Sequence, residues 1–158
     1  MRPSRDMMNA GEFCSRTVVF VHPGDRVAEA ARLMREHHVG DVVVVKDTSG
    51  GKRRPIGVLT DRDIVVSVVA KAPDYVGTLE VGEVMSQTLV TADEDDPLWD
   101  VLKRMRTAGV RRLPVIDREG VLLGIITFDD LVEFVAGELN DLSSLLSREQ
   151  AHEIERRS

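Results

Sequence analysis

Two aspartates occupy the same place in two copies of one short pattern. Residues 57–63 read glycine, two apolar residues, threonine, two variable residues and aspartate, and residues 124–130 repeat this order sixty-seven positions later. An ionised carboxylate can accept two hydrogen bonds from the cis-diol of a ribose, and charge-assisted hydrogen bonds are the stronger class. Asp63 and Asp130 are therefore candidates for binding a pair of sugar hydroxyls.

The same pattern also has a purely structural interpretation. Thr-x-x-Asp at the start of a helix is close to a capping box, in which the threonine hydroxyl caps the helix and the acid favours its first turn. A duplication copies a cap as readily as a binding site, and one residue can serve both purposes. Thr60 and Thr127 carry the same two alternatives, because a helix N-terminus also attracts an anionic phosphate.

Basic residues near a strand add a candidate phosphate site. Arg111 and Arg112 directly precede an apolar strand in an otherwise acidic chain, and a guanidinium fork suits phosphate; a solvated pair at the strand entrance is an equal alternative. The matching positions of the first copy are Gly40 and Asp41, so positive charge is expected to be missing there. Arg62 would partly substitute, and the two sites should differ in affinity.

Five further positions complete the candidate set. Val58 and Ile125 would offer apolar contact and backbone polar groups to a base, although an ordinary core role explains them as well. Thr17 and Thr88 open the first predicted strand of each copy, where β-propensity alone accounts for their side chains. Asp129 makes the rim of the second copy more acidic than that of the first.

The elements around both patterns repeat in the same order. Each half is predicted to run strand, amphipathic helix, buried strand, strand and helix. For the first half these elements are residues 17–21, 25–38 with Asp25 as N-cap, 42–45, 55–59 and 60–70. A single half of about 60 residues would bury too little surface for comfortable independence. We therefore expect an α/β (α+β) fold of two tandem β-α-β-β-α repeats, packed sheet to sheet with pseudo-two-fold symmetry.

The repeat divides the chain into five segments. They are an N-terminal arm (1–13), a first repeat (14–72), a linker (73–82), a second repeat (83–140), and a C-terminal helix end and tail (141–158). The arm is expected to be loosely held, with at most one helical turn. The charged residues 147–158 are expected to fray.

Composition excludes several classes of function. The chain has 21 basic and 27 acidic residues, and its net charge of −6 argues against broad binding to nucleic acid or anionic membrane. No run approaches the roughly 18 apolar residues of a membrane span.

The single cysteine, Cys14, favours a reducing cytoplasm. It aligns with Met85 of the second repeat, which favours packing over nucleophilic chemistry. The adjacent His37 and His38 point in different directions, so no metal site is expected. Nothing resembles a Ser-His-Asp or Cys-His arrangement, so no catalytic residue is expected.

These features together resemble a tandem pair of CBS domains (a Bateman module) of the stand-alone bacterial type. The resemblance covers roughly residues 12–140. It rests on both glycine-apolar-apolar-threonine-x-x-aspartate patterns, on the strand at 113–117, and on the amphipathic helix before each central strand.

The resemblance implies a regulatory, non-enzymatic module. Such modules bind AMP, ADP, ATP, S-adenosylmethionine or a dinucleotide such as NAD in the cleft between the two domains, some with Mg²⁺ through the nucleotide. They commonly form homodimers and regulate a partner, here unidentified. The resemblance places Asp63 and Asp130 on ribose, and Arg111 and Arg112 near phosphate. It places the strand starts at Thr17 and Thr88 at the adenine edge, mainly through nearby backbone. A structural interaction module with vestigial pockets is the alternative, with a partner on the terminal helix or the basic loop at 52–54.

Overall fold

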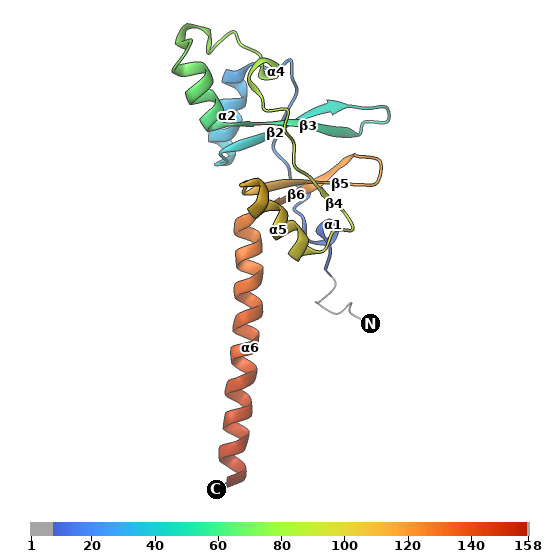
Figure 1. Ribbon diagram of the computed structural model, residues 1–158, viewed down its shortest axis with the longest axis vertical. Helices are drawn as coiled ribbons and strands as arrows, with labels where there is room; N and C mark the ends of the chain where they lie inside the picture. Colours follow the sequence, from blue (N-terminus) through green and yellow to red (C-terminus); the bar gives the residue numbers. More distant parts are fainter. Residues whose placement is uncertain (1–7, 158) are drawn as a thin grey trace. The chain divides into compact units, whose positions relative to one another are not determined.

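The computed structural model describes residues 8–157 (Figure 1). By its internal contacts the chain forms two compact units, one up to Ile126 and one from Thr127 onwards.

The first repeat builds a three-stranded sheet in the order β1-β2-β3. Strand β1 (Phe20–Val21) is parallel to β2 (Asp41–Asp47), and β2 is antiparallel to β3 (Arg53–Thr60). Helix α2 (Val27–His37) connects β1 to β2, and β3 leads into α3 (Asp61–Asp63) and the π-helical segment η2 (Ile64–Val69).

The second repeat builds a second three-stranded sheet in the order β4-β5-β6. Its elements are β4 (Ala92–Asp93), α5 (Leu98–Ala108), β5 (Arg112–Ile116) and β6 (Leu122–Thr127). The predicted mixed α+β architecture of two tandem repeats is confirmed. The opening strands are shorter than predicted and begin after Thr17 and Thr88, because their pairing extends over only two residues in each sheet.

The valine run in β2 is buried on both faces, as its continuous apolar sequence predicts. Val42 and Val44 belong to the core of the first repeat, under α2. Val43 and Val45 point the other way and form a second cluster with Ile125 of β6. This second cluster packs the first sheet against the second, so one strand contributes to two cores.

A short entry segment precedes each repeat and binds to the other repeat. The first, residues 10–15, begins with α1 (Ala10–Phe13), whose Ala10 and Gly11 N–H groups donate to the carbonyls of Asp96 and Glu94, both at 2.8 Å. The predicted helical turn is therefore confirmed. The predicted looseness of the arm is wrong for residues 8–13, because these hydrogen bonds hold it; residues 1–7 lie outside the described part of the chain.

The second entry segment, residues 81–86, repeats this arrangement on the first repeat. It begins with α4 (Val81–Val84), and the N–H groups of Val81 and Gly82 donate to the carbonyls of Asp25 and Pro23 at 2.8 and 2.9 Å. Most of the predicted linker before it is irregular, with the 3-10 turn η3 (Pro73–Tyr75).

The glycine of each pattern is explained by the entry segment that crosses it. Ser15 forms an antiparallel bridge with Ile125, with N–H···O distances of 3.0 and 2.9 Å. A Cβ on Gly124 would collide with the Ser15 carbonyl oxygen and lie 2.6 Å from Cys14 Sγ. Ser86 crosses Val58 in the same way, and a Cβ on Gly57 would lie 2.6 Å from the Ser86 carbonyl oxygen. Both glycines are needed for close approach of two backbones.

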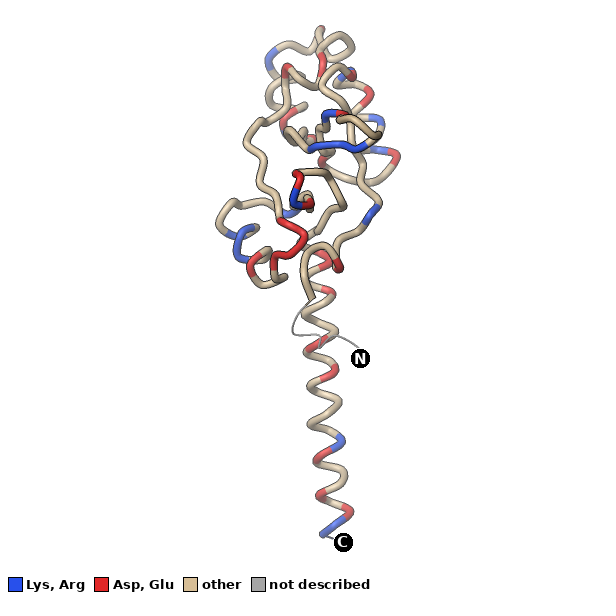
Figure 2. The backbone as a smooth tube through the Cα atoms, turned by 90° about the vertical axis from the view of Figure 1, so that its right-hand side faces the viewer, with Lys and Arg blue, Asp and Glu red and all other residues tan. Residues whose placement is uncertain are grey.

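The second unit consists of helix α6 (Phe128–Arg157) and the residue before it. The prediction that the tail frays is wrong for residues 147–157, which remain helical. Acidic residues occupy the first turn and Arg156 and Arg157 the last, which favours both helix ends through the macrodipole (Figure 2). Within residues 8–157, no helix is long and apolar enough to cross a membrane.

Candidate functional site

The first pattern forms the capping box that its sequence predicts. Thr60 is the N-cap of α3 with extended backbone, since it is also the last residue of β3. Its hydroxyl accepts from the Asp63 N–H at 3.0 Å, and Asp63 Oδ2 accepts from the Thr60 N–H at 3.0 Å. In the described part of the chain no hydrogen bond is made by Asp63 Oδ1. The half-buried carboxylate therefore caps the helix with one oxygen and presents the other to a further donor.

The second pattern forms half of this box. The Asp130 N–H donates to the Thr127 hydroxyl at 3.1 Å. Asp130 is exposed, as is the neighbouring Asp129, and both lie in the first turn of α6. The two copies therefore share the threonine cap and differ in how firmly the aspartate is held.

A cation from the second repeat lies beside the first pattern. Asp41 is directly opposite Thr60 in the β2–β3 register, and Arg112 Nε lies 3.2 Å from Asp41 Oδ1. The expectation that positive charge is missing at the first copy is therefore wrong. Sequence comparison treated Asp41 and Arg112 as equivalent positions, whereas in the fold they are partners.

A second carboxylate, that of Asp61, lies near Asp41. The Asp61 N–H donates to the Gly40 carbonyl at 2.9 Å, which brings the Asp61 side chain close to the start of β2. Burial raises the pKa of the Asp41 carboxyl; Arg112 opposes this shift and Asp61 adds to it. Ionised Asp41 is thus poorly solvated and depends on Arg112 for its compensation.

The two candidate threonines follow the crossings made by the entry segments. The Thr17 N–H donates to the Ser15 hydroxyl and the Thr88 N–H to the Ser86 hydroxyl, both at 3.3 Å. Because Ser15 bridges to Ile125, Thr17 comes directly after the contact with the second pattern. Thr88 likewise follows the contact with the first pattern. Sequence reasoning missed Ser15 and Ser86, although they stand at the same offset as Cys14 and Met85.

The backbones of Val58 and Ile125 are already occupied. Their N–H groups donate to Ser86 and Ser15, and their carbonyls accept from the same residues. Ile125 is buried in the cluster between the sheets, which fits the core interpretation, while Val58 is half-buried. What these residues can offer a base is therefore side-chain contact rather than a backbone N–H.

The remaining basic candidates lie at the surface. Arg62 is exposed within α3, and its N–H donates to Asp61 Oδ1 at 2.7 Å. Arg111 is exposed and precedes the half-buried Arg112 at the start of β5. The structure thus brings Thr60, Asp63 and Arg112 close to one strand end.

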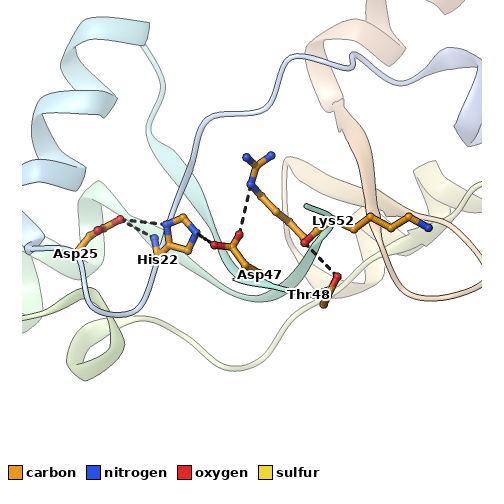
Figure 3. Close-up of polar contacts among 6 residues, drawn as sticks. His22, Asp25, Asp47, Thr48 and Lys52 are labelled. Carbon is orange, nitrogen blue, oxygen red and sulfur yellow. Dashed lines mark hydrogen bonds and ion pairs between the residues drawn. The ribbon is translucent and has the colours of Figure 1, made fainter. Parts of the chain in front are cut away.

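A polar cluster around His22 lies at the other end of β2 from Asp41, where the strand ends at Asp47 (Figure 3). His22 Nε2 is 3.1 Å from Asp47 Oδ2, and its Nδ1 is 3.7 Å from Asp25 Oδ2. Asp47 also pairs with Arg53 at 3.7 Å. The two carboxylates face opposite ring nitrogens, so they cannot share one metal ion with the histidine. Among residues 8–157, no group of three or more His, Cys, Asp or Glu side chains could hold a metal.

The predicted helix start at Asp25 is wrong. Arg26 is the N-cap of α2 and makes no side-chain cap bond. The Asp25 carboxylate instead accepts from the His22 N–H at 2.7 Å and closes the turn after β1.

Cys14 packs as the sequence comparison with Met85 predicts. It is buried against Gly124, and burial raises the pKa of its thiol. A neutral buried thiol is a poor nucleophile.

The family model for the CBS domain matches residues 10–70 and 81–137. The chain therefore belongs to the CBS domain family and carries this domain twice. It is 38% identical over 128 residues to uncharacterized protein MK0525 of Methanopyrus kandleri, covering 80% of this chain but only 62% of that protein.

Two solved structures show this fold with ligands. The cytosolic domain of the Mg²⁺ channel MgtE in complex with ATP is 29% identical, with a TM-score of 0.65, covering 80% of this chain and 48% of that one. The CBS domain pair of protein MJ0100 in complex with 5′-methylthioadenosine and S-adenosyl-L-methionine has a TM-score of 0.69 and covers 84% and 98%. At 23% identity, the second likeness concerns the fold alone.

Proposed function

We propose that this CBS pair is a regulatory module that binds an adenosyl ligand (AMP, ADP or ATP, with NAD and S-adenosylmethionine as alternatives) through its two patterns. The observation that carries the proposal is Asp63, whose Oδ1 is left for a donor at the N-terminus of α3. Arg112 supplies a guanidinium near the same strand end. The MgtE cytosolic domain, which is similar in fold and 29% identical in sequence, was solved with ATP.

Each candidate residue then has a role in this proposal. Asp63 and Asp130 accept the ribose hydroxyls, and Thr60 and Thr127 stand beside the ribose or phosphate at helix N-termini, whose dipole favours an anion. The base is contacted by Thr17, Val58, Thr88 and Ile125. The phosphates are contacted by Arg62, Arg111 and Arg112. Asp129 lies at the rim of the second site. Mg²⁺ would enter with the nucleotide. The binding of the ligand is communicated to a regulated protein in the cytoplasm, and this chain itself catalyses no reaction.

The double variant Asp63→Asn/Asp130→Asn tests the ribose role. Asparagine keeps one carbonyl oxygen for the helix cap and replaces the other acceptor by a donor, so the cap survives while the diol loses a partner. We expect wild type to bind at least one of AMP, ATP, NAD and S-adenosylmethionine in calorimetry. The variant should bind that ligand at least about tenfold more weakly, as expected for a lost charge-assisted hydrogen bond.

The matched control is Asp74→Asn/Asp100→Asn, which makes the same change of net charge on surface residues outside both patterns. It should bind like wild type. Absence of binding by every ligand to the wild-type chain, or equal affinity of the pattern variant, contradicts the proposal.

We also propose that the module is a homodimer. Val65 and Val132 stand at equivalent positions after the two patterns, and they are 57% and 49% exposed. Val66 and Val69 add exposed apolar surface on η2. Exposed apolar surface of this kind marks interaction sites, and equivalent surface in both repeats suits a symmetric partner.

Replacing both valines, as Val65→Lys/Val132→Lys, should raise the dissociation constant of the dimer at least about tenfold, because each lysine introduces charge into apolar contact. Sedimentation velocity across a dilution series measures this. Thr107→Lys, at an exposed position of α5, is the control and should leave the dimer unchanged. A double variant with wild-type association would show that neither valine contributes to a dimer contact.

A further inference from the structure

One ion pair joins equivalent positions of the two repeats. Asp41 is the first residue of β2 and Arg112 is the first residue of β5, and their side chains meet at 3.2 Å. One position is an acid and the other a base, and the two charges neutralise each other beside Thr60.

The pair is partly shielded and still reachable from solvent. The side chains of Arg112 and Asp41 are 29% and 24% exposed. Such shielding makes the attraction stronger than between fully exposed charges, and it makes repulsion by a second like charge stronger too. An anion bound to Arg112 therefore lies near the carboxylate of Asp41, and the Asp61 carboxylate is close to Asp41 as well.

We propose that Asp41 is an internal competitor for Arg112. Its carboxylate occupies the guanidinium that a ligand phosphate would take, and so it sets how far the first site prefers anionic over neutral adenosyl ligands. This inference rests on the proposed function and names a specificity determinant of that site.

The geometry gives the competition a definite form. Arg112 reaches Asp41 through Nε, whereas a phosphate favours two parallel hydrogen bonds from the guanidinium edge. To form them, the phosphate must displace Asp41 or share the arginine with a like charge. Displacing Asp41, or sharing Arg112 with it, weakens the binding of AMP. Adenosine has the same base and ribose but no phosphate, so its binding is not weakened in this way.

Calorimetry of AMP and adenosine on a set of variants measures the effect. Asp41→Asn should raise the affinity for AMP about tenfold, as expected when a competing carboxylate is removed from a charge-assisted contact, and should change that for adenosine less than about twofold. Arg112→Gln should remove the preference for AMP. In the Arg112→Gln background, Asp41→Asn should bring no gain, because the contested group is absent.

A second arm does not depend on any adenosyl ligand. Inorganic pyrophosphate is titrated while the Arg112 Nε–H resonance is followed by NMR in wild type and in Asp41→Asn. The resonance should shift at about tenfold lower pyrophosphate concentration in the variant. Asp61→Asn leaves the Asp41–Arg112 contact in place and should lower the required pyrophosphate concentration by a smaller factor. This variant replaces Asp41→Asn in the experiment if Asp41→Asn does not fold.

The two arms separate the possible failures. If no adenosyl ligand binds wild type or variants, the proposed function fails, and pyrophosphate alone decides the role of Asp41. Equal pyrophosphate concentrations at half-saturation in wild type, Asp41→Asn and Asp61→Asn would overturn the inference. An equal gain for AMP and adenosine in Asp41→Asn would overturn it as well, because it would show a general structural effect.

Discussion

Replacing Gly124 by alanine should lower the free energy of unfolding by about 3 kcal/mol, the upper range for overpacking a tightly packed site. The added methyl would collide with the Ser15 carbonyl oxygen and lie 2.6 Å from Cys14 Sγ. To remove this collision, the entry segment at residues 10–15 must move away from Gly124. That movement breaks both hydrogen bonds between Ser15 and Ile125. Urea denaturation followed by circular dichroism measures the loss.

Gly137→Ala is the matched control. A Cβ at Gly137 meets nothing within 4 Å, and the residue lies inside α6. Alanine there should leave stability unchanged or raise it by about 0.5–1 kcal/mol through helix propensity. Gly57→Ala should resemble Gly124→Ala, since its Cβ would lie 2.6 Å from the Ser86 carbonyl oxygen. Wild-type stability of both pattern variants would show that the entry segments do not constrain these positions.

Leu59→Ala should cost about 3 kcal/mol, within the range measured for large-to-small changes in cores. Leu59 is fully buried in the core of the first repeat, one residue before the Thr60 cap. Removing three carbons leaves a cavity among neighbours that include Val44 and Val68. The midpoint of urea unfolding should fall, while the dependence on urea concentration should stay as in wild type.

Leu142→Ala provides the comparison. This leucine is 59% exposed on α6, and its truncation should change the free energy of unfolding by less than about 0.5 kcal/mol. Equal losses for Leu59→Ala and Leu142→Ala would contradict the placement of the core.

Local spacing was sufficient to predict those parts of the molecule that local interactions determine. The valines at 42–45 predict a strand buried on both faces, and the structure has one that serves two cores. Thr-x-x-Asp predicts the capping box formed by Thr60 and Asp63. In both cases the residues in contact are close in sequence or follow the period of a strand. The contact can therefore be predicted from the local spacing alone.

Contacts between the repeats could not be predicted in this way. Asp41 and Arg112 are equivalent when the repeats are aligned, and alignment says nothing about whether equivalent residues touch. The same holds for Ser15 on Ile125 and for Ser86 on Val58, which depend on chain crossings. The length of α6 was missed because its charged end has no apolar stripe, and helix continuity there rests on local propensity and end charges.

The exchange of entry segments also bears on how such a molecule can be divided. The sequence repeats as entry segment plus repeat, but in space each repeat is closed by the entry segment of the other. A chain cut at the boundary of the duplication would thus yield two fragments, each carrying the closing piece that its counterpart requires. Such fragments would recover their structure by complementation, mixed together, rather than alone. Up to Ile126, the two copies thus form one interlocked unit, in which neither copy is complete by itself.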